Sequence, residues 1–370
     1  MANAKFSNVV LFANESRDLY DAMNAYKEEC IKERKGIASF SNGRTKTAME
    51  ELIDKQYRIE LFTKAAKFGI EAPKDGSDTE FKRFSNKGVV REFADEIQNN
   101  VIDMILPDVI MQGSLPYIAD IRTAELDDSI KFNIENNSYF TVSKAGNRKR
   151  ETNFQKLEDT TFVMRGENHE VSVFATLFEL LTGRVSFAKN MMKVAMSIEA
   201  QMFNEAYSAF RTEALTLTGN LQTTNITSQA VMALAQTVTA YNQRRQAVIL
   251  GTPVALTKVV PSNANYRYDF NSDFVKTGYL QLFNGFELVP MQQYADYTST
   301  NYGLALKDSE IFIVSPSSDK IVKIGLFGGV MTHTDQPYDN ANKTVGTTIE
   351  KSWGVSVVTG STMGVITAVN

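Results

Sequence analysis

Apolar side chains recur every three or four positions through the first part of the chain. Leu19, Met23 and Tyr26 fall at this spacing, and a second set recurs over residues 49–57. A repeat of about 3.6 residues places such side chains on one face of an α-helix, so the pattern predicts two helices in this region. Residues 39–47 are rich in Ser, Asn and Gly, which is typical of a loop between helices.

The stretch APKDGSD, residues 72–78, is the clearest break in this half of the chain. A further helix is expected from about residue 89 to residue 105, ending before Pro107 because proline cannot donate a helical hydrogen bond. Residues 1–100 carry 17 basic and 17 acidic side chains, whereas residues 214–370 carry only 10 of each. This contrast and the break predict that the first hundred residues are dispensable for folding of the remainder but not for assembly.

A different pattern follows, in which apolar and polar side chains alternate. Ile130, Phe132 and Ile134 point to one side of an extended chain, and the residues between them point to the other. Extended character returns around residues 161–163, beyond the polar run KAGNRKRET. The pattern predicts a long two-stranded hairpin whose tip carries four cations, namely Lys144, Arg148, Lys149 and Arg150.

Such a hairpin needs a surface on which to lie, because an isolated two-stranded ribbon is marginally stable in water. No neighbouring segment obviously supplies one, so a second subunit is the candidate. The cationic tip allows two interpretations: it binds the phosphate backbone of a nucleic acid, or it docks on acidic groups of another copy of the chain. We favour docking, since the tip lacks an interleaved aromatic residue and the chain as a whole has no basic surplus.

The strongest helical pattern lies between residues 186 and 212. Its apolar positions form one continuous stripe, made of Phe187, Met191, Val194, Ile198, Met202 and Phe210. At a rise of about 1.5 Å per residue this helix would be a rod of ~40 Å, and we expect the stripe to be its core face. Glu199 and Glu205 lie off the stripe.

The rest of the pattern alternates between helices and strands and becomes mostly β. A short helix over residues 174–184 should end near Gly183, and a longer helix spans residues 228–245. Residues 246–259 indicate a strand, a Gly-Thr-Pro turn and another helix. Later strands are expected at residues 285–291, 309–316, 320–327 and 352–358. The chain is therefore expected to be an α+β protein.

Composition narrows the class of protein. With 370 residues, 43% of them hydrophobic, the chain is long enough for roughly two or three folded units with a sizeable core. A net charge of −4 argues against a strongly basic nucleic-acid binder. Cys30 is the only cysteine, so a disulfide framework within the chain is excluded and a reducing compartment is expected. We expect neither a secretory leader nor a membrane span.

Common catalytic motifs are missing from the sequence. It holds no GxxxxGK[ST] phosphate loop, no GxGxxG dinucleotide motif and no GxSxG nucleophile motif. His169 and His333 each have acidic neighbours, so either is a candidate base oriented by a carboxylate, although we prefer a surface histidine in both cases. Cys30, among lysines and glutamates, is expected to be incidental. We expect no cofactor and no metal; an enzyme with scattered catalytic residues stays an alternative.

The order of these elements resembles that of the HK97-like major capsid proteins of tailed bacteriophages. That family has an N-terminal arm, an extended hairpin called the E-loop, a spine helix in a peripheral P-domain, an α/β axial A-domain, and returning strands. Over roughly residues 110–370 this sequence has the same order. The resemblance implies a helical N-terminal arm or inner region (1–110), the E-loop (111–170), the spine helix of the P-domain (171–213), the A-domain (214–305) and returning strands of both domains (306–370).

The resemblance also implies a function. The protein would be a structural, non-enzymatic shell protein that self-assembles into hexamers and pentamers of an icosahedral capsid around a phage genome. Assembly would take place in the cytoplasm of the host bacterium. Expected partners are further copies of the chain, portal, scaffolding and decoration proteins, and packaged DNA through non-specific contacts. Encapsulin nanocompartment shells, which hold cargo enzymes, use the same fold and stay an alternative.

Overall fold

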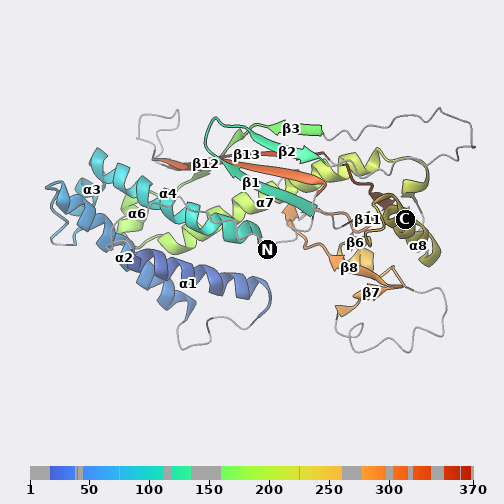
Figure 1. Cartoon of the computed structure of the whole chain (residues 1–370). Helices are drawn as coiled ribbons and strands as arrows, with labels where there is room; N and C mark the ends of the chain where they lie inside the picture. Colours follow the sequence, from blue (N-terminus) through green and yellow to red (C-terminus); the bar gives the residue numbers. More distant parts are fainter. Residues whose placement is uncertain are drawn as a thin grey trace, which may run out of the picture.

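A long helix connects two differently built parts of the molecule. In the computed structural model, the N-terminal helices and a four-stranded sheet surround one part of this helix, and a six-stranded sheet lies near its other end (Figure 1). The expected α+β class is confirmed. The structure describes residues 17–37, 40, 45–74, 76–111, 118–134, 160–224, 226–260, 277–296, 303–315, 320–334, 346–358 and 360–367.

The N-terminal region is helical, as expected. It forms α1 (Arg17–Arg34), α2 (Lys46–Lys67), α3 (Asp78–Ser85) and α4 (Gly88–Met111). The prediction that the last of these ends before Pro107 is wrong, because α4 continues through the proline to Met111. Proline removes one helical hydrogen bond, whereas the buried side chains around it, including Leu106 and Val109, keep this turn packed in the core.

The N-terminal helices belong to the main core. The ring of Tyr57 on α2 stacks on the ring of Phe187, with 4.0 Å between their centroids. The backbone N–H of Val330 in the four-stranded sheet donates a hydrogen bond to the carboxylate of Asp103 on α4, at 2.9 Å. One continuous cluster of buried apolar side chains includes α1, α2, α4, the long helix and this sheet. The packing contradicts the expectation that the remainder folds without the first hundred residues.

The long helix is α7 (Phe187–Leu215). The side chain of Ser186 caps its first turn, and the carboxylate of Asp54 on α2 accepts a hydrogen bond from the backbone of Ala188. These contacts fix the start of α7 against α2. The apolar residues of the predicted stripe are each at most 2% exposed: Phe187, Met191, Val194, Ile198, Met202 and Phe210.

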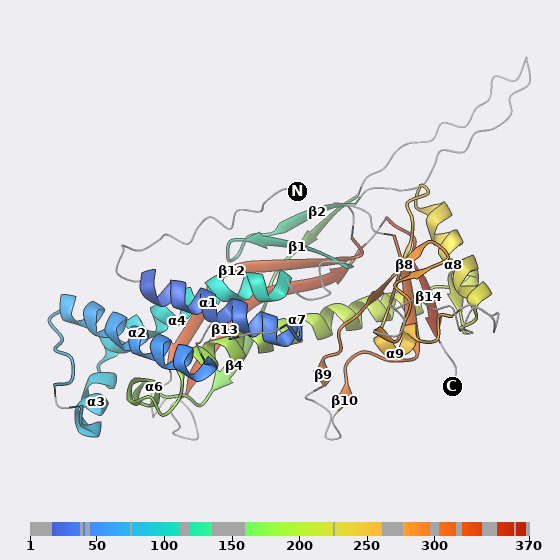
Figure 2. The ribbon, with the colours of Figure 1, turned by 90° about the horizontal axis from the view of Figure 1, so that it is seen from below.

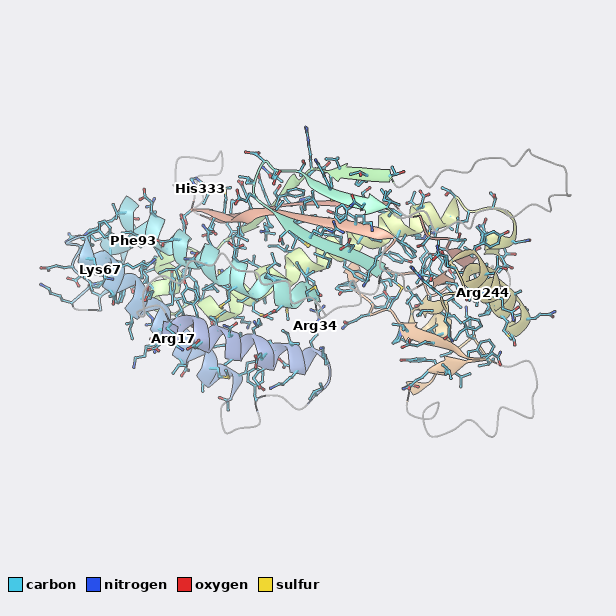
Figure 3. The ribbon with its side chains drawn as sticks, viewed as in Figure 1. Arg17, Arg34, Lys67, Phe93, Arg244 and His333 are labelled. Atoms are coloured by element: carbon cyan, nitrogen blue, oxygen red, sulfur yellow. The ribbon has the colours of Figure 1, made fainter. Side chains whose placement is uncertain are left out.

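The backbone conformation explains where two shorter helices end. Helix α6 (Leu177–Thr182) stops at Gly183, whose φ of 73° is the left-handed conformation that glycine adopts without strain. Helix α8 (Ser228–Tyr241) ends before the expected residue 245, because Gln243 and Arg244 have positive φ angles of 56° and 61°. Arg244 is labelled in Figure 3.

The four-stranded sheet, which we call the spine sheet, covers α4 and α7. Its strands, in spatial order, are β1 (Ala119–Ala124), β12 (Val322–Thr334), β13 (Thr347–Val357) and β4 (Glu167–Val173). Strand β1 runs parallel to β12, and the other pairs are antiparallel. Strand β4 is not predicted by the sequence pattern, because it is an edge strand whose residues are polar, charged or only half-buried.

The predicted hairpin is present at its root. Strands β2 (Ile130–Ile134) and β3 (Thr160–Met164) pair antiparallel, with Phe132 opposite Phe162. Both views show the two strands along the spine sheet, and Figure 1 places them on the side away from α4 (Figures 1 and 2).

The six-stranded sheet, which we call the distal sheet, carries a second core with α8. In spatial order it contains β5 (Gln222–Thr223), β14 (Gly364–Thr367), β11 (Glu310–Val314), β6 (Val248–Gly251), β8 (Phe286–Pro290) and β7 (Leu282–Phe283). Helix α9 (Pro253–Leu256) follows β6 directly, as the Gly-Thr-Pro turn predicted. The turn η1 (Gly219–Leu221) and the short pair β9 (Ala295–Asp296) and β10 (Gly303–Leu304) complete this part.

Candidate assembly surface

The hairpin root is anchored on the chain's own sheet. Phe132 is fully buried and packs with Ile130 and with Phe327 of β12. Gly325 makes room for them, because a Cβ at this position would lie 2.9 Å from the Ile130 side chain and 2.8 Å from Phe327. The guanidinium carbon of Arg122 lies 4.6 Å from the centre of the Phe132 ring, a cation–π contact. The surface that the hairpin needs is thus supplied, at its root, by its own chain.

In sequence, the predicted cationic tip falls between β2 and β3. Ile134 and Thr160 are paired directly with each other, and residues 135–159 connect them in sequence. The predicted tip cations lie outside the described residues: Lys144, Arg148, Lys149 and Arg150. Their docking role stays a prediction.

A groove of about 680 Å³ lies beside the hairpin root. Strand β3 forms one wall, where the Val163 side chain is 49% exposed. Helix α7 contributes Ser208, Ala209 and Thr212 to the lining, and β13 contributes residues 354–356. The groove therefore joins three segments that are far apart in sequence.

His169 of β4 and Trp353 of β13 also line the groove. Their rings stack with 3.6 Å between centroids and 6° between planes. Nε2 of His169 lies 3.3 Å from the carboxylate of Glu205 on α7, and the indole N–H of Trp353 donates to the same carboxylate at 2.7 Å. Nδ1 of His169 lies 3.0 Å from the carbonyl oxygen of Glu167. A single carboxylate thus connects the sheet edge to the helix.

This geometry suits a structural histidine better than a catalytic base. Both ring nitrogens of His169 are already engaged, Nδ1 with the Glu167 carbonyl oxygen and Nε2 with the Glu205 carboxylate, so neither is left to act on a substrate. A carboxylate does orient the ring, as the sequence allowed, but it is Glu205 of α7 and not a neighbour in sequence. His333, labelled in Figure 3, is exposed near the end of β12.

Acidic side chains dominate the charged lining of the groove. Glu167, Glu205 and Glu213 contribute carboxylates, and Arg165 is the one lining arginine among the described residues. Glu167 and Glu213 are exposed, so both can meet an incoming cation. None of these is recognisable as a site residue from the sequence, because the set exists only after β3, β4, β13 and α7 come together.

Two buried carboxylates fix α7 to its surroundings. Glu199 is 1% exposed, although it lies off the apolar stripe. It pairs with the guanidinium of Arg34 at 2.6 and 3.0 Å and accepts a hydrogen bond from the Tyr294 hydroxyl at 3.1 Å. Arg34, labelled in Figure 3, ends α1, and Tyr294 lies between β8 and β9. One carboxylate therefore joins the N-terminal helices, the spine helix and the distal part.

The second buried carboxylate contacts the same helix, α7, further along. Glu310 at the start of β11 is 4% exposed and makes a bidentate ion pair with Arg211, with contacts of 2.7 to 2.9 Å. The Tyr207 hydroxyl donates to the same carboxylate at 3.2 Å. Burial raises the pKa of Tyr207 to about 12, so this hydroxyl stays protonated and keeps donating at neutral pH.

Buried ionisable groups also line the interfaces between helices and sheet. Burial raises the pKa of three carboxyl groups, Asp54, Asp95 and Asp103. Burial lowers the pKa of Lys351 on β13, whose Nζ lies 3.7 Å from the Asp103 carboxylate. These groups hold elements together and lie apart from the groove.

The described residues offer little for catalysis. The Cys30 thiol is buried, and burial raises its pKa, which disfavours the reactive thiolate. Within the described part of the chain, no group of three or more His, Cys, Asp or Glu residues could hold a metal ion. No helix there is long and apolar enough to cross a membrane.

Solved structures that are similar to this chain include capsids and a virus-like particle. The chain is similar to the asymmetric unit of the mature capsid of bacteriophage PhiM1, with a TM-score of 0.46, 10% identity, and coverage of 70% of this chain and 87% of that one. It is similar to a virus-like particle from Pyrococcus furiosus, with a TM-score of 0.43, 9% identity, and coverage of 70% and 95%. It is also similar to the capsid of the empty GTA particle, with a TM-score of 0.45, 13% identity, and coverage of 70% and 90%.

No curated protein sequence matches the chain. The model of one protein family does, over residues 26–367; its description is "SPbeta prophage-derived putative capsid protein YonB". The match includes most of the N-terminal helices, the hairpin, the spine helix and both sheets. The chain therefore belongs to the YonB family of prophage-derived capsid proteins.

Proposed function

We propose that this capsid protein is the shell subunit that self-assembles into hexamers and pentamers and closes an icosahedral capsid around a phage genome in the host cytoplasm. The observation that carries the proposal is the hairpin, whose root is locked onto the spine sheet while its cationic segment belongs to residues 135–159. In this proposal the root is held by its own chain and the tip docks on a neighbour. Each exposed ion pair at the tip contributes only ~0.2–1 kcal/mol, but a shell repeats the contact many times.

The regions of the subunit take on separate roles in this proposal. Residues 1–110 form an enlarged arm or inner-surface region, residues 111–170 the E-loop, and residues 171–213 the spine. Residues 214–305 form the axial domain, and residues 306–370 return through both sheets. Portal, scaffolding and decoration proteins, and packaged DNA held by non-specific contacts, are the proposed partners.

The proposal is tested by reversing the tip charges. A variant with Lys144, Arg148, Lys149 and Arg150 all changed to Glu should keep the wild-type melting temperature, because the buried core of the described residues is built without them. It should form no closed particles by negative-stain microscopy, whereas wild type forms them and does so less readily as salt rises. A matched control changes four exposed cations elsewhere to Glu, namely Lys35, Lys55, Lys87 and Lys258.

Normal particles from the tip variant would refute the docking role. A wild-type chain that stays monomeric under every assembly condition would refute the shell function itself. Purified particles that protect no nucleic acid from nuclease would favour the encapsulin alternative over a genome-filled capsid.

A further inference from the structure

The outer end of the N-terminal helices carries an exposed aromatic patch. Phe68 directly follows α2 and is 68% exposed, and its ring centre lies 4.9 Å from that of Phe93 on α4. Val89, one turn before Phe93 on the same helix, is 41% exposed. We call these three residues the terminal patch. Clustered apolar side chains that stay exposed mark a surface to which another segment can bind.

Helix α1 runs parallel to α4 and begins just short of this patch. Three contacts join the two helices, each between residues eighty or eighty-one positions apart: Tyr20 with Asn100, Asn24 with Met104, and Lys27 with Asp108. Arg17, the first residue of α1, is therefore level with Ile97 of α4. Phe93 lies one turn, about 6 Å, beyond this level, and Val89 lies two turns, about 12 Å, beyond it. Figure 3 labels Arg17 and Phe93.

Helices α2 and α4 continue together past the start of α1. Lys64 on α2 pairs with Glu96 on α4 at 3.0 Å, and the contact of Phe68 with Phe93 follows one turn later. Helix α1 packs against both helices, but only as far as Arg17. The terminal patch therefore lies where a continuation of the chain before α1 would cover it.

The segment before Arg17 matches the patch in chemistry and in reach. Residues 1–16 lie outside the described residues. Among them, residues 6–13 (FSNVVLFA) have six apolar side chains and no charged one. At the offset between α1 and α4, Val9 would be level with Val89. An extended chain covers about 3.3 Å per residue, so this segment is long enough to reach the whole patch.

We propose that residues 6–13 bind the terminal patch of their own chain and continue the cover that α1 gives to α2 and α4. Removal of Phe68 and Val89 from water drives the contact. The occupant is the same chain, because attachment at Arg17 holds the segment beside the patch at high effective concentration. This inference concerns the single subunit and does not depend on shell formation.

Cysteine cross-linking of the full chain tests the contact. In a chain with Cys30→Ala, Val9→Cys is combined with Val89→Cys and the protein is oxidised. We expect a disulfide within one chain, found after trypsin digestion as residues 6–17 joined to residues 88–91. The melting temperature of the reduced protein establishes that the variant is folded.

The control replaces the second cysteine with one at Leu52, an exposed position on α2. The Tyr26 hydroxyl donates to the Glu50 carboxylate, which places Leu52 about two turns from the level of Arg17, on the side away from the patch. A segment that is merely tethered would reach both positions equally, whereas a bound segment should leave this second pair reduced.

Equal disulfide yields for the two pairs would overturn the inference. Oxidation of a mixture of ¹⁵N-labelled and unlabelled subunits identifies the chain that donates the segment. Linked peptides that combine both labels would show that a second copy covers the patch, which would also overturn the proposal.

Melting temperatures provide an independent test. Leu11→Asp with Phe12→Asp should lower the melting temperature, and Ser7→Asp with Asn8→Asp, which adds the same charge, should lower it less. Phe68→Ser should also lower it, and adding this change to the Leu11 and Phe12 variant should have little further effect, because the contact is already lost. No effect of the Leu11 and Phe12 changes, or full additivity with Phe68→Ser, would contradict binding at the patch.

Discussion

At the scale of single residues, buried carboxylates determine how the parts of the subunit are held. Glu199 and Glu310 are matched by arginines and tyrosine hydroxyls, which offset the cost of burying their charge. Neither pairing can be inferred from the sequence, because Arg34 is 165 positions from Glu199 and Arg211 is 99 positions from Glu310. Periodicity identifies which face of a helix is apolar, but it cannot identify a charge whose partner comes from another element.

Stability should rise as the pH falls from neutral toward 5. Burial raises the pKa of Asp54, Asp95 and Asp103 above the ordinary value of 3.8. The folded state therefore binds these protons more tightly, and its extra stability is lost as pH rises through the raised pKa values. We expect a larger free energy of unfolding by urea at pH 5 than at pH 7.

Asp54→Asn should reduce that pH dependence, because the amide oxygen can still accept from Ala188 but no longer titrates. Asp21→Asn, at an exposed position on α1, serves as the control and should leave the dependence unchanged. Equal slopes for wild type and Asp54→Asn between pH 5 and 7 would show that Asp54 does not contribute.

At the scale of elements, the sequence was most informative where periodicity was long. The stripe from Phe187 to Phe210 predicted α7 and its buried face, and Gly183 correctly indicated the end of α6. Strands β1 and β4 were missed because each lies at an edge of the spine sheet and has few buried residues. Pro107 wrongly predicted the end of α4, because tertiary packing around the helix outweighs the local preference of proline.

A charge introduced on the core face of α7 should destabilise the subunit. Ile198 is 2% exposed, so Ile198→Asp buries an unpaired charge and should destabilise the subunit by several kcal/mol, on the order of 3–5. The neighbouring Ser197 is exposed, and Ser197→Asp should change stability by less than ~0.5 kcal/mol. Thermal melting compares the two. Similar melting temperatures for both variants would mean that this face is not core.

At the scale of the whole molecule, the subunit has one core that N-terminal helices, spine helix and spine sheet share. The sequence suggested a separable N-terminal unit because composition and charge change along the chain. Composition describes exposed faces well, but it does not show which helix covers which sheet. The acidic groove was equally hidden, because its lining comes from residues 162–169, 205–213 and 353–356.

Removal of the N-terminal region should therefore prevent folding. A chain that starts at Ile102 loses α1, α2 and more than half of α4, and it exposes apolar residues of α7 that they cover. We expect no cooperative thermal transition by circular dichroism and aggregation in sedimentation. A cooperative transition near the wild-type temperature would restore the idea of an independent N-terminal unit.

The pairing of β1 with β12 has a consequence for how the protein forms in the cell. Ala119 pairs with Val322, about two hundred positions later, and β4 pairs only with β13 within the described residues. Contacts between such distant segments make folding slow, and synthesis proceeds from the N-terminus. The hairpin root therefore cannot be anchored on β12, and the groove beside it cannot form, until residues 322–357 have left the ribosome. If the proposed function holds, only completed subunits are competent to assemble.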